Sequence, residues 1–223
     1  MRVMVMGSTG AIGSEIIRQC LDDARITDVL AISRRALRIH HPKLRVAALT
    51  DFKDYSAILD DLSRVEFCFC ALGVSQTQER DPTRYYEITH NYVMAAAEAL
   101  NGRNPRARFF FVSGYGTDPT QKSKLYWARV KGETENDLRK LFGERLTIFR
   151  PGYVHPVHPR EHFLLLDFLS RPLILFKPLL PWLVTDTVEV ARAMIKIVAG
   201  DKSPALVENR DIRAAATENP KGR

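Results

Sequence analysis

The first fourteen residues, MRVMVMGSTGAIGS, constrain the fold of this chain more than any other stretch. Residues 2–6 form an apolar run of the length of one buried strand. Gly7, Gly10 and Gly13 follow at once, and apolar residues then recur at helical spacing. A strand, a glycine-rich turn and a helix in this order are typical of a segment that binds the phosphates of a dinucleotide. The glycines allow the backbone to approach a pyrophosphate closely, and the helix N-terminus offers it unpaired N–H groups.

The spacing of these glycines, G-x-x-G-x-x-G, differs from the G-x-G-x-x-G of the standard dinucleotide fingerprint. No Gly-Lys-Ser/Thr sequence closes the turn, which excludes a P-loop. Any tight strand-to-helix turn can hold three glycines, so the inference depends on the strand before the turn and the helix after it. We predict that the cofactor-binding residues of this turn are Gly7, Thr9, Gly10, Ala11, Ile12 and Gly13.

The remainder of the chain alternates between short apolar runs and helical patterns. Further strands are predicted at 28–32, 44–49, 65–72, 108–113 and 146–149, and helices at 54–62, 82–100, 124–141 and 187–199. This alternation predicts an α/β fold, a Rossmann-type doubly wound parallel sheet with helices on both faces. We expect a single NAD(P)-binding domain over residues 1–223, in which 153–186 form a small C-terminal substrate-side or interface insertion and 209–223 a polar tail.

The charge of the chain limits the kinds of partner that it can bind, and its cysteine content indicates the compartment in which it works. The 33 Lys+Arg exceed the 26 Asp+Glu, but the basic residues are scattered, so no nucleic-acid partner is predicted. Cys20, Cys68 and Cys70 form no Cys-x-x-Cys pair and no disulfide framework, which indicates a reducing compartment. Because a core strand is predicted from Arg2, no signal peptide is expected, and a cytoplasmic location is predicted.

The stretch 163–184 is apolar but contains three prolines and several charges. A transmembrane helix needs about 20 largely uncharged apolar residues, so none is predicted here. We interpret the stretch as short helices that cover a small-molecule substrate, or that form a homodimer or membrane-surface contact. His155, His158 and His162 precede it among prolines, where no helix fixes their spacing, so no metal site is predicted.

The choice of cofactor is predicted from the residues that follow the second strand. An acidic residue that holds a ribose 2′-hydroxyl is expected about 20 residues past the glycine turn. Ser33, Arg34 and Arg35 stand there instead. A hydroxyl and two guanidinium groups suit a 2′-phosphate, which arginine can bind with two hydrogen bonds, so NADP(H) is predicted over NAD(H). A solvated basic turn is the alternative interpretation.

Two further segments at strand ends complete the predicted cofactor site. Asp51 and Phe52 follow the third strand, where they would contact the adenine. Ala71, Leu72 and Gly73 end the fourth strand, where they would let the backbone pass close to the cofactor. In open α/β sheets, ligands bind outside the carboxyl ends of the strands, where both segments are predicted to lie.

These motifs resemble those of atypical short-chain dehydrogenases, in particular the Tat-interacting-protein-like branch and its bacterial relatives in the NAD-dependent epimerase/dehydratase family. The resemblance covers nearly the whole chain, up to about Ile212. It rests on residues 7–13, 51–52, 67–73, 130–133, 149–152 and 208–212. It implies a Rossmann-type core and a nicotinamide cofactor, with Lys131 bonded to the nicotinamide ribose and the Pro151–Gly152 backbone beside the nicotinamide.

The catalytic groups of this family are a serine or threonine, followed by Tyr-x-x-x-Lys on one helix face. The lysine ammonium lowers the pKa of the phenol, which then exchanges a proton with the substrate. Ser113 and Lys131 match this pattern, but Trp127 stands in the tyrosine position. An indole N–H donates a hydrogen bond but does not titrate usefully. Tyr126 is one residue further away and points roughly 140° from Lys131 on an ideal helix.

Four explanations for the missing phenol stay open. A local bulge could bring Tyr126 round, so it is retained with Ser113 and Lys131 as a predicted catalytic residue, or Tyr115 or Tyr153 could serve from a nearby loop. In the fourth, no residue supplies the proton. The first three predict an NADP-dependent oxidoreductase or epimerase-like enzyme that acts on a small carbonyl or alcohol. The fourth predicts a weakly active or inactive NADPH-binding regulatory protein that reports to a protein partner.

Overall fold

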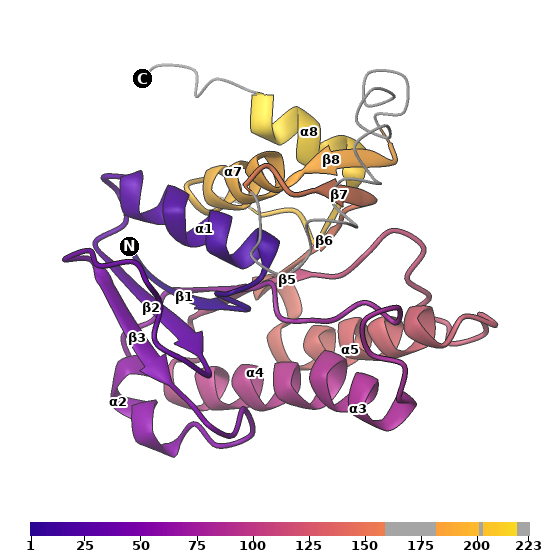
Figure 1. Ribbon diagram of the computed structural model, residues 1–223, viewed down its shortest axis with the longest axis horizontal. Helices are drawn as coiled ribbons and strands as arrows, with labels where there is room; N and C mark the ends of the chain where they lie inside the picture. The colour runs from indigo at the N-terminus through magenta and orange to yellow at the C-terminus, as the bar shows by residue number, and fades with distance from the viewer. Residues whose placement is uncertain (159–181, 201–202, 218–223) are drawn as a thin grey trace.

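The computed structural model of the protein describes residues 1–158, 182–200 and 203–217. Within these residues the core is a sheet of seven parallel strands (Figure 1). In chain order they are β1 (Arg2–Met6), β2 (Asp28–Ser33), β3 (Leu44–Ala48), β4 (Phe67–Cys70), β5 (Arg108–Val112), β6 (Leu146–Arg150) and β9 (Leu206–Glu208). Their spatial order is β3-β2-β1-β4-β5-β6-β9, so the winding direction reverses between β1 and β4. This is the doubly wound arrangement, and the predicted Rossmann-type fold is confirmed.

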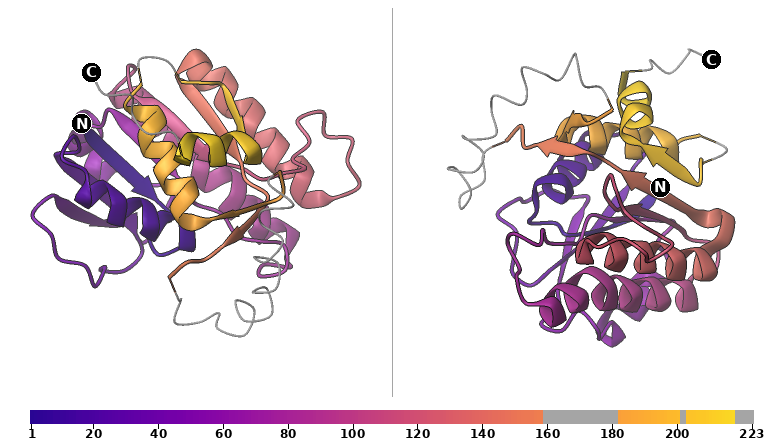
Figure 2. Two further views of the ribbon diagram at one scale, coloured as in Figure 1. Left: turned by 90° about the horizontal axis from the view of Figure 1, so that it is seen from above. Right: turned by 90° about the vertical axis from the view of Figure 1, so that its right-hand side faces the viewer.

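Helices cover both faces of this sheet (Figures 1 and 2). On one face lie α1 (Ala11–Asp22), α7 (Thr187–Val198) and α8 (Asn209–Thr217), and on the other α2 (Leu59–Leu62), α4 (Tyr92–Arg103) and α5 (Tyr126–Phe142). The 3₁₀ turns η1 (Ser56–Ile58) and η3 (Gly143–Arg145) precede α2 and follow α5. The inner strands are apolar on both sides because both sides are buried, whereas the edge strands β3 and β9 are partly exposed. In β5, Phe109 and Phe111 share a core with α4 and α5, whereas Phe110 shares the opposite core with α1 and α7.

The segment after β4 is a continuous helical run with a π turn in its middle. It begins with α3 (Pro82–Tyr86), where the side chain of Asp81 accepts the N–H of Thr83 at 2.9 Å. The π turn η2 (Glu87–Asn91) then leads into α4. A helix is predicted over 82–100 and is present, but the sequence pattern gives no sign of the π turn. Such a turn inserts one extra residue into a helix, which changes the face that each following residue presents.

The end of the chain differs from the predicted polar tail. Residues 209–217 form α8, and Ile212 and Ala216 are buried in the core that α1 and α7 share. These two side chains lie one helical turn apart, which lets an otherwise polar helix dock through a narrow apolar stripe. The three-residue strand β9 pairs with β6 in the sheet, and a segment this short carries no periodicity that would reveal it.

The predicted insertion 153–186 is described only at its two ends. β7 (Tyr153–His155) and β8 (Val184–Asp186) pair with each other as a small parallel sheet. Residues 159–181 lie outside the described residues, and with them the predictions for His162 and for most of the apolar stretch. Among the helices that the structure describes, none has the length and apolar character to cross a membrane.

Helix α5 is held close to the loop after β5 by the absence of a side chain at Gly132. A Cβ at this position would lie 2.0 Å from the carbonyl oxygen of Asp118. The N–H of Asp118 in turn donates to the carbonyl of Ala128 at 3.0 Å, and its carboxylate accepts the N–H of Ser123 at 2.7 Å. Gly132 therefore sets the distance between α5 and the loop that connects it to β5.

We expect Gly132→Ala to lower the free energy of unfolding by about 1–3 kcal/mol, the usual cost of overpacking. Gly102→Ala in α4 is the matched control, because no heavy atom lies within 4 Å of its added Cβ. Alanine is favoured over glycine inside a helix by up to about 1 kcal/mol, so this variant should be neutral or more stable. Urea unfolding followed by circular dichroism measures both, and equal effects would contradict the packing argument.

Candidate functional site

The glycine-rich turn between β1 and α1 has no room for side chains at two of its glycines. Gly7 has a φ of 74°, and a Cβ there would lie 2.4 Å from the carbonyl oxygen of Ala71, just after β4. A Cβ on Gly13 would lie 2.1 Å from the carbonyl oxygen of Gly7. The N–H of Gly10 donates to that same oxygen at 2.8 Å. The turn, the start of α1 and the end of β4 therefore meet backbone to backbone.

A pocket with a volume of about 380 Å³ lies at the carboxyl ends of β1, β2 and β4, where the winding of the sheet reverses. Nine of the predicted cofactor residues line it: Gly7, Thr9, Gly10, Ser33, Arg34, Phe52, Ala71, Leu72 and Gly73. Ala11, Ile12 and Gly13, also predicted, occupy the first turn of α1, which has no side-chain cap. The N–H groups of such an uncapped first turn can bind an anion.

Two predicted residues are adjacent to this pocket without lining it. Arg35 is exposed, and its backbone N–H donates to Oγ of Ser33 at 3.2 Å. The carboxylate of Asp51 accepts the N–H of Lys53 at 2.9 Å, and Thr50 lines the pocket in its place. Asp51 therefore does not line the pocket, whereas its neighbours Thr50 and Phe52 do, and the adenine contact stays a prediction.

Sequence reasoning missed seven residues of the pocket wall, which are Ser8, Ile32, Thr50, Val74, Arg84, Ile88 and Tyr92. The last three recur every four residues along α3, η2 and α4. That spacing marks one face of a helix and was available in the sequence. It does not distinguish a helix face that lines a pocket from one that lines the core.

Arg84 gives the pocket a second guanidinium group besides that of Arg34. Its Nη1 donates to the phenol oxygen of Tyr92 at 2.9 Å and pairs with the carboxylate of Glu87. The same carboxylate pairs with the ammonium of Lys53 at 3.2 Å. These contacts hold the Arg84 side chain against the pocket wall.

Ser113 and Lys131 lie side by side just beyond the Gly73 end of the pocket. The Nζ of Lys131 donates to the carbonyl oxygen of Ser113 at 3.5 Å and lies 3.9 Å from the position of a Cβ on Gly73. The buried Ser113 hydroxyl is 3.0 Å from Oγ1 of Thr117, which itself donates to the carbonyl of Gly114. Since the Thr117 proton is used there, Ser113 donates to Thr117 and keeps its lone pairs for another donor.

The surroundings of Lys131 favour its neutral form. Burial lowers the pKa of its ammonium from 10.5 to about 8, and the nearby Cys70 and Glu135 act in the opposite direction. Its Nζ lies 5.7 Å from the centre of the Phe111 ring, and Glu135 is committed to Arg150 at 2.6 Å. A lysine with a pKa this close to neutrality can exchange protons during a reaction.

Tyr126 does not take part in this arrangement. Its phenol donates to the carbonyl of Pro82 at 3.0 Å, and its ring packs against that of Tyr85. Burial raises the pKa of the phenol, and Glu133 adds to this effect. α5 is a regular helix from its first residue, so no bulge turns the phenol toward Lys131. The predicted catalytic role of Tyr126 is corrected accordingly.

The other three aromatic residues near the site, Trp127, Tyr115 and Tyr153, each contact a neighbouring loop or strand. Trp127 packs against the loop after β5, where a Cβ on Gly116 would lie 3.4 Å from its indole ring. The Tyr115 side chain is 53% exposed, and its N–H donates to the carbonyl of Pro151 at 2.8 Å. The N–H of Tyr153 donates to the carbonyl of Leu183. These contacts give Trp127 a packing role and leave Tyr115 and Tyr153 as predictions.

The Pro151–Gly152 segment joins the end of β6 to the C-terminal elements and does not line the pocket. The N–H of Gly152 donates to Oδ1 of Asn209 at 2.8 Å, and a Cβ on Gly152 would lie 2.1 Å from the carbonyl oxygen of Leu183. Close to the glycine-rich turn, Nδ1 of His158 lies 3.1 Å from Oε2 of the buried Glu15 of α1. Among the described residues the three groups that could hold a metal ion together are instead His90, Glu133 and Asp137.

Comparison with known proteins identifies the family. Residues 3–148 match the NAD dependent epimerase/dehydratase family. The protein fmp52, mitochondrial, of Emericella nidulans is 27% identical over 157 residues, which are 68% of this chain and 66% of that protein. Protein HTATIP2 of Rattus norvegicus is 25% identical over 152 residues, 67% of this chain and 61% of that protein. The chain thus spans slightly less than two thirds of the length of these relatives.

Solved structures show the same fold at low identity. The enzyme WbmF of Bordetella bronchiseptica, solved in complex with NAD⁺, matches 96% of this chain and 76% of its own with a TM-score of 0.66 and 16% identity. The UDP-N-acetylglucosamine 4-epimerase of Methanobrevibacter ruminantium matches 92% of this chain and 75% of its own, with a TM-score of 0.67 and 17% identity.

These relatives contradict the predicted cytoplasmic location. The fungal relatives are named as mitochondrial proteins, which points away from the cytoplasm. The prediction rested on the position of the first core strand in the sequence, and that position carries no information about the compartment.

We expect the Nζ of Lys131 to titrate near pH 8, well below the ordinary lysine value of 10.5. Because the unfolded chain then binds this proton more tightly, the free energy of unfolding should rise with pH between about 8 and about 10.5. NMR of ¹³C-labelled lysine measures the titration, with Lys131→Arg assigning the signal. A Lys131 signal that titrates with the exposed lysines would contradict the burial argument.

Proposed function

The chain belongs to the NAD dependent epimerase/dehydratase family, and we propose that it is an oxidoreductase that binds NADP(H) in preference to NAD(H) and acts on a small carbonyl or alcohol. One observation carries this proposal. A single pocket has Ser33 and Arg34 in its wall at the end of β2, and Ser113 and Lys131 lie just beyond its Gly73 end. Side chains that suit a ribose phosphate and side chains that suit proton exchange thus lie at the same end of the sheet, where the strands have their carboxyl ends.

The pocket fits the nicotinamide cofactor of this family. The backbone contacts at Gly7 and Gly13 leave no side chain between the sheet edge and a pyrophosphate. The uncapped N-terminus of α1 would bind the phosphates, and Phe52 would pack against the adenine. Ser33 and Arg34 would bind a 2′-phosphate, for which a guanidinium group is a two-pronged donor.

The mechanism then rests on two side chains. When bound, the nicotinamide supplies or accepts the hydride. Ser113, whose lone pairs are free to accept a hydrogen bond, orients the hydroxyl of an alcohol substrate. Lys131 gives a proton to the substrate oxygen in reduction and takes one in oxidation, because its lowered pKa lets it change charge near neutral pH. In this proposal Lys131 takes the role that a tyrosine at position 127 would have.

A regulatory protein that binds NADPH without turnover is the second proposal. Trp127 carries no titratable group, and the Tyr126 phenol is committed to Pro82. A chain that has lost its phenol and keeps an intact pocket suits a protein that reports cofactor concentration to a partner.

Arg34→Ala should weaken NADPH binding by about tenfold to hundredfold, the worth of hydrogen bonds to a charged group. NADH binding should change by less than about twofold, because NADH lacks the 2′-phosphate. Fluorescence titration of the reduced cofactors measures both, with Arg106→Ala as an exposed control. An equal loss for NADPH and NADH would place Arg34 away from the 2′-phosphate.

Lys131→Met should abolish NADPH oxidation in a screen over carbonyl substrates while NADPH still binds. Tyr126→Phe should leave the rate unchanged, because its hydroxyl is bonded to Pro82. The rate of the unaltered protein should follow one ionisation near pH 8. Loss of turnover in Tyr126→Phe would contradict the role given to Lys131.

The same screen separates the two proposals. Tight NADPH binding with no turnover on any carbonyl substrate would favour the regulatory protein. Failure to bind either nucleotide would overturn both.

A further inference from the structure

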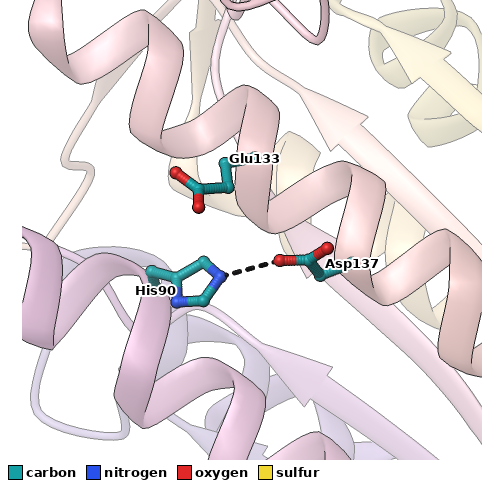
Figure 3. A group of neighbouring side chains, drawn as sticks. All are labelled: His90, Glu133 and Asp137. Atoms are coloured by element: carbon teal, nitrogen blue, oxygen red, sulfur yellow. Dashed lines mark hydrogen bonds and ion pairs between the residues drawn. The ribbon is translucent and has the colours of Figure 1, made fainter.

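A second group of polar side chains lies between the π turn and α5, outside the nucleotide pocket. His90 comes from η2, and Glu133 and Asp137 come from α5 (Figure 3). Each offers one ligand atom, and these three atoms lie within 4.8 Å of one another. All three side chains are half-buried, and none of them lines the pocket. We refer to them as the His90 cluster.

The backbone brings the three residues to one place for simple reasons. Glu133 and Asp137 are four residues apart on α5, so their side chains leave the helix on the same face. The π turn places His90 opposite that face, and its Nε2 lies 3.0 Å from Oδ2 of Asp137. π turns occur frequently at functional sites in proteins.

Each member of the cluster is also held from outside by a further group. Nδ1 of His90 bonds to Oδ1 of Asn91 at 3.0 Å. Oε1 of Glu133 accepts the phenol proton of Tyr86 at 2.9 Å. Oδ1 of Asp137 accepts from Lys140 at 2.8 Å. Each bond uses one of the two ligand atoms of its side chain and leaves the second for the centre, as outer partners do around metal-bound histidines and carboxylates.

The charges of the cluster suit a divalent cation. Hydrogen bonds from Lys140 and His90 lower the pKa of Asp137, so this carboxylate stays ionised. Two carboxylates balance two positive charges, and the imidazole nitrogen favours zinc and similar transition metals over Mg²⁺ or Ca²⁺, which prefer oxygen ligands alone.

We propose that His90, Glu133 and Asp137 bind a zinc-class divalent cation through one imidazole nitrogen and two carboxylate oxygens. The ion replaces the His90–Asp137 hydrogen bond and draws the three ligand atoms to about 2.0–2.2 Å from itself, with water in the remaining position. It thereby clamps the π turn to α5. This inference is independent of the proposed function, because it uses no residue of the nucleotide pocket.

The test is a calorimetric titration of the tag-free, chelator-treated full chain with ZnCl₂. We expect one zinc ion per chain, no binding of MgCl₂ at the same concentrations, and weaker zinc binding in mildly acidic buffer because a protonated imidazole cannot ligate. His90→Gln should weaken zinc binding at least about tenfold, and Tyr86→Phe, which removes an outer partner, by about tenfold. His40→Gln, at an exposed histidine elsewhere, should change nothing.

A second readout separates a metal site from surface binding. Co²⁺ should give visible absorption bands of a low-symmetry site in the unaltered chain and lose them in His90→Gln and in Glu133→Gln, which changes a single atom. Far-ultraviolet circular dichroism of each variant verifies that it is folded. Absence of zinc binding would overturn the inference, as would binding whose affinity and spectrum are the same in His90→Gln and Glu133→Gln as in the unaltered chain.

Discussion

The structure depends on one close contact, the meeting of backbone with backbone at the glycine-rich turn. The carbonyl oxygen of Ala71 and that of Gly7 occupy the space where side chains on Gly7 and Gly13 would lie. This contact lets β1 and β4 lie next to each other while α1 starts directly above their ends. A side chain at either glycine would force these backbones apart and change the shape of the crevice at the reversal of winding.

The fold could be read from the sequence because its signals repeat along the chain. Apolar runs mark six of the strands, and helical periodicity marks the long helices. Strands and helices that alternate in this way are typical of an α/β fold with a parallel sheet. β9 and α8 could not be read, because three residues carry no period and two buried side chains, Ile212 and Ala216, are too few to mark an amphipathic helix. Tertiary contacts decide their structure.

Some residues of the candidate site could likewise be predicted from the sequence, and others could not. The glycines, Ser33, Arg34 and Gly73 could be placed because a strand end fixes where the backbone goes next. Arg84 and Tyr92 could not, because a helical stripe looks the same whether it faces a pocket or a core. The fate of the Tyr126 phenol depends on Pro82, which is 44 residues away in the chain and adjacent in space. No local pattern contains such a contact, whereas helical geometry alone already set Tyr126 apart from Lys131.

The π turn makes a single stretch of backbone serve two surfaces. Ile88 and Tyr92 line the nucleotide pocket, and His90 between them faces α5. A ligand bound between the π turn and α5 would therefore contact the same stretch of backbone as a ligand bound in the nucleotide pocket. Thermodynamic linkage requires such an influence to be mutual. If a ligand bound on the α5 side changes the affinity for the nucleotide by some factor, the nucleotide changes the affinity for that ligand by the same factor. A displacement of the π turn made from the α5 side would therefore reach two residues of the pocket wall, Ile88 and Tyr92.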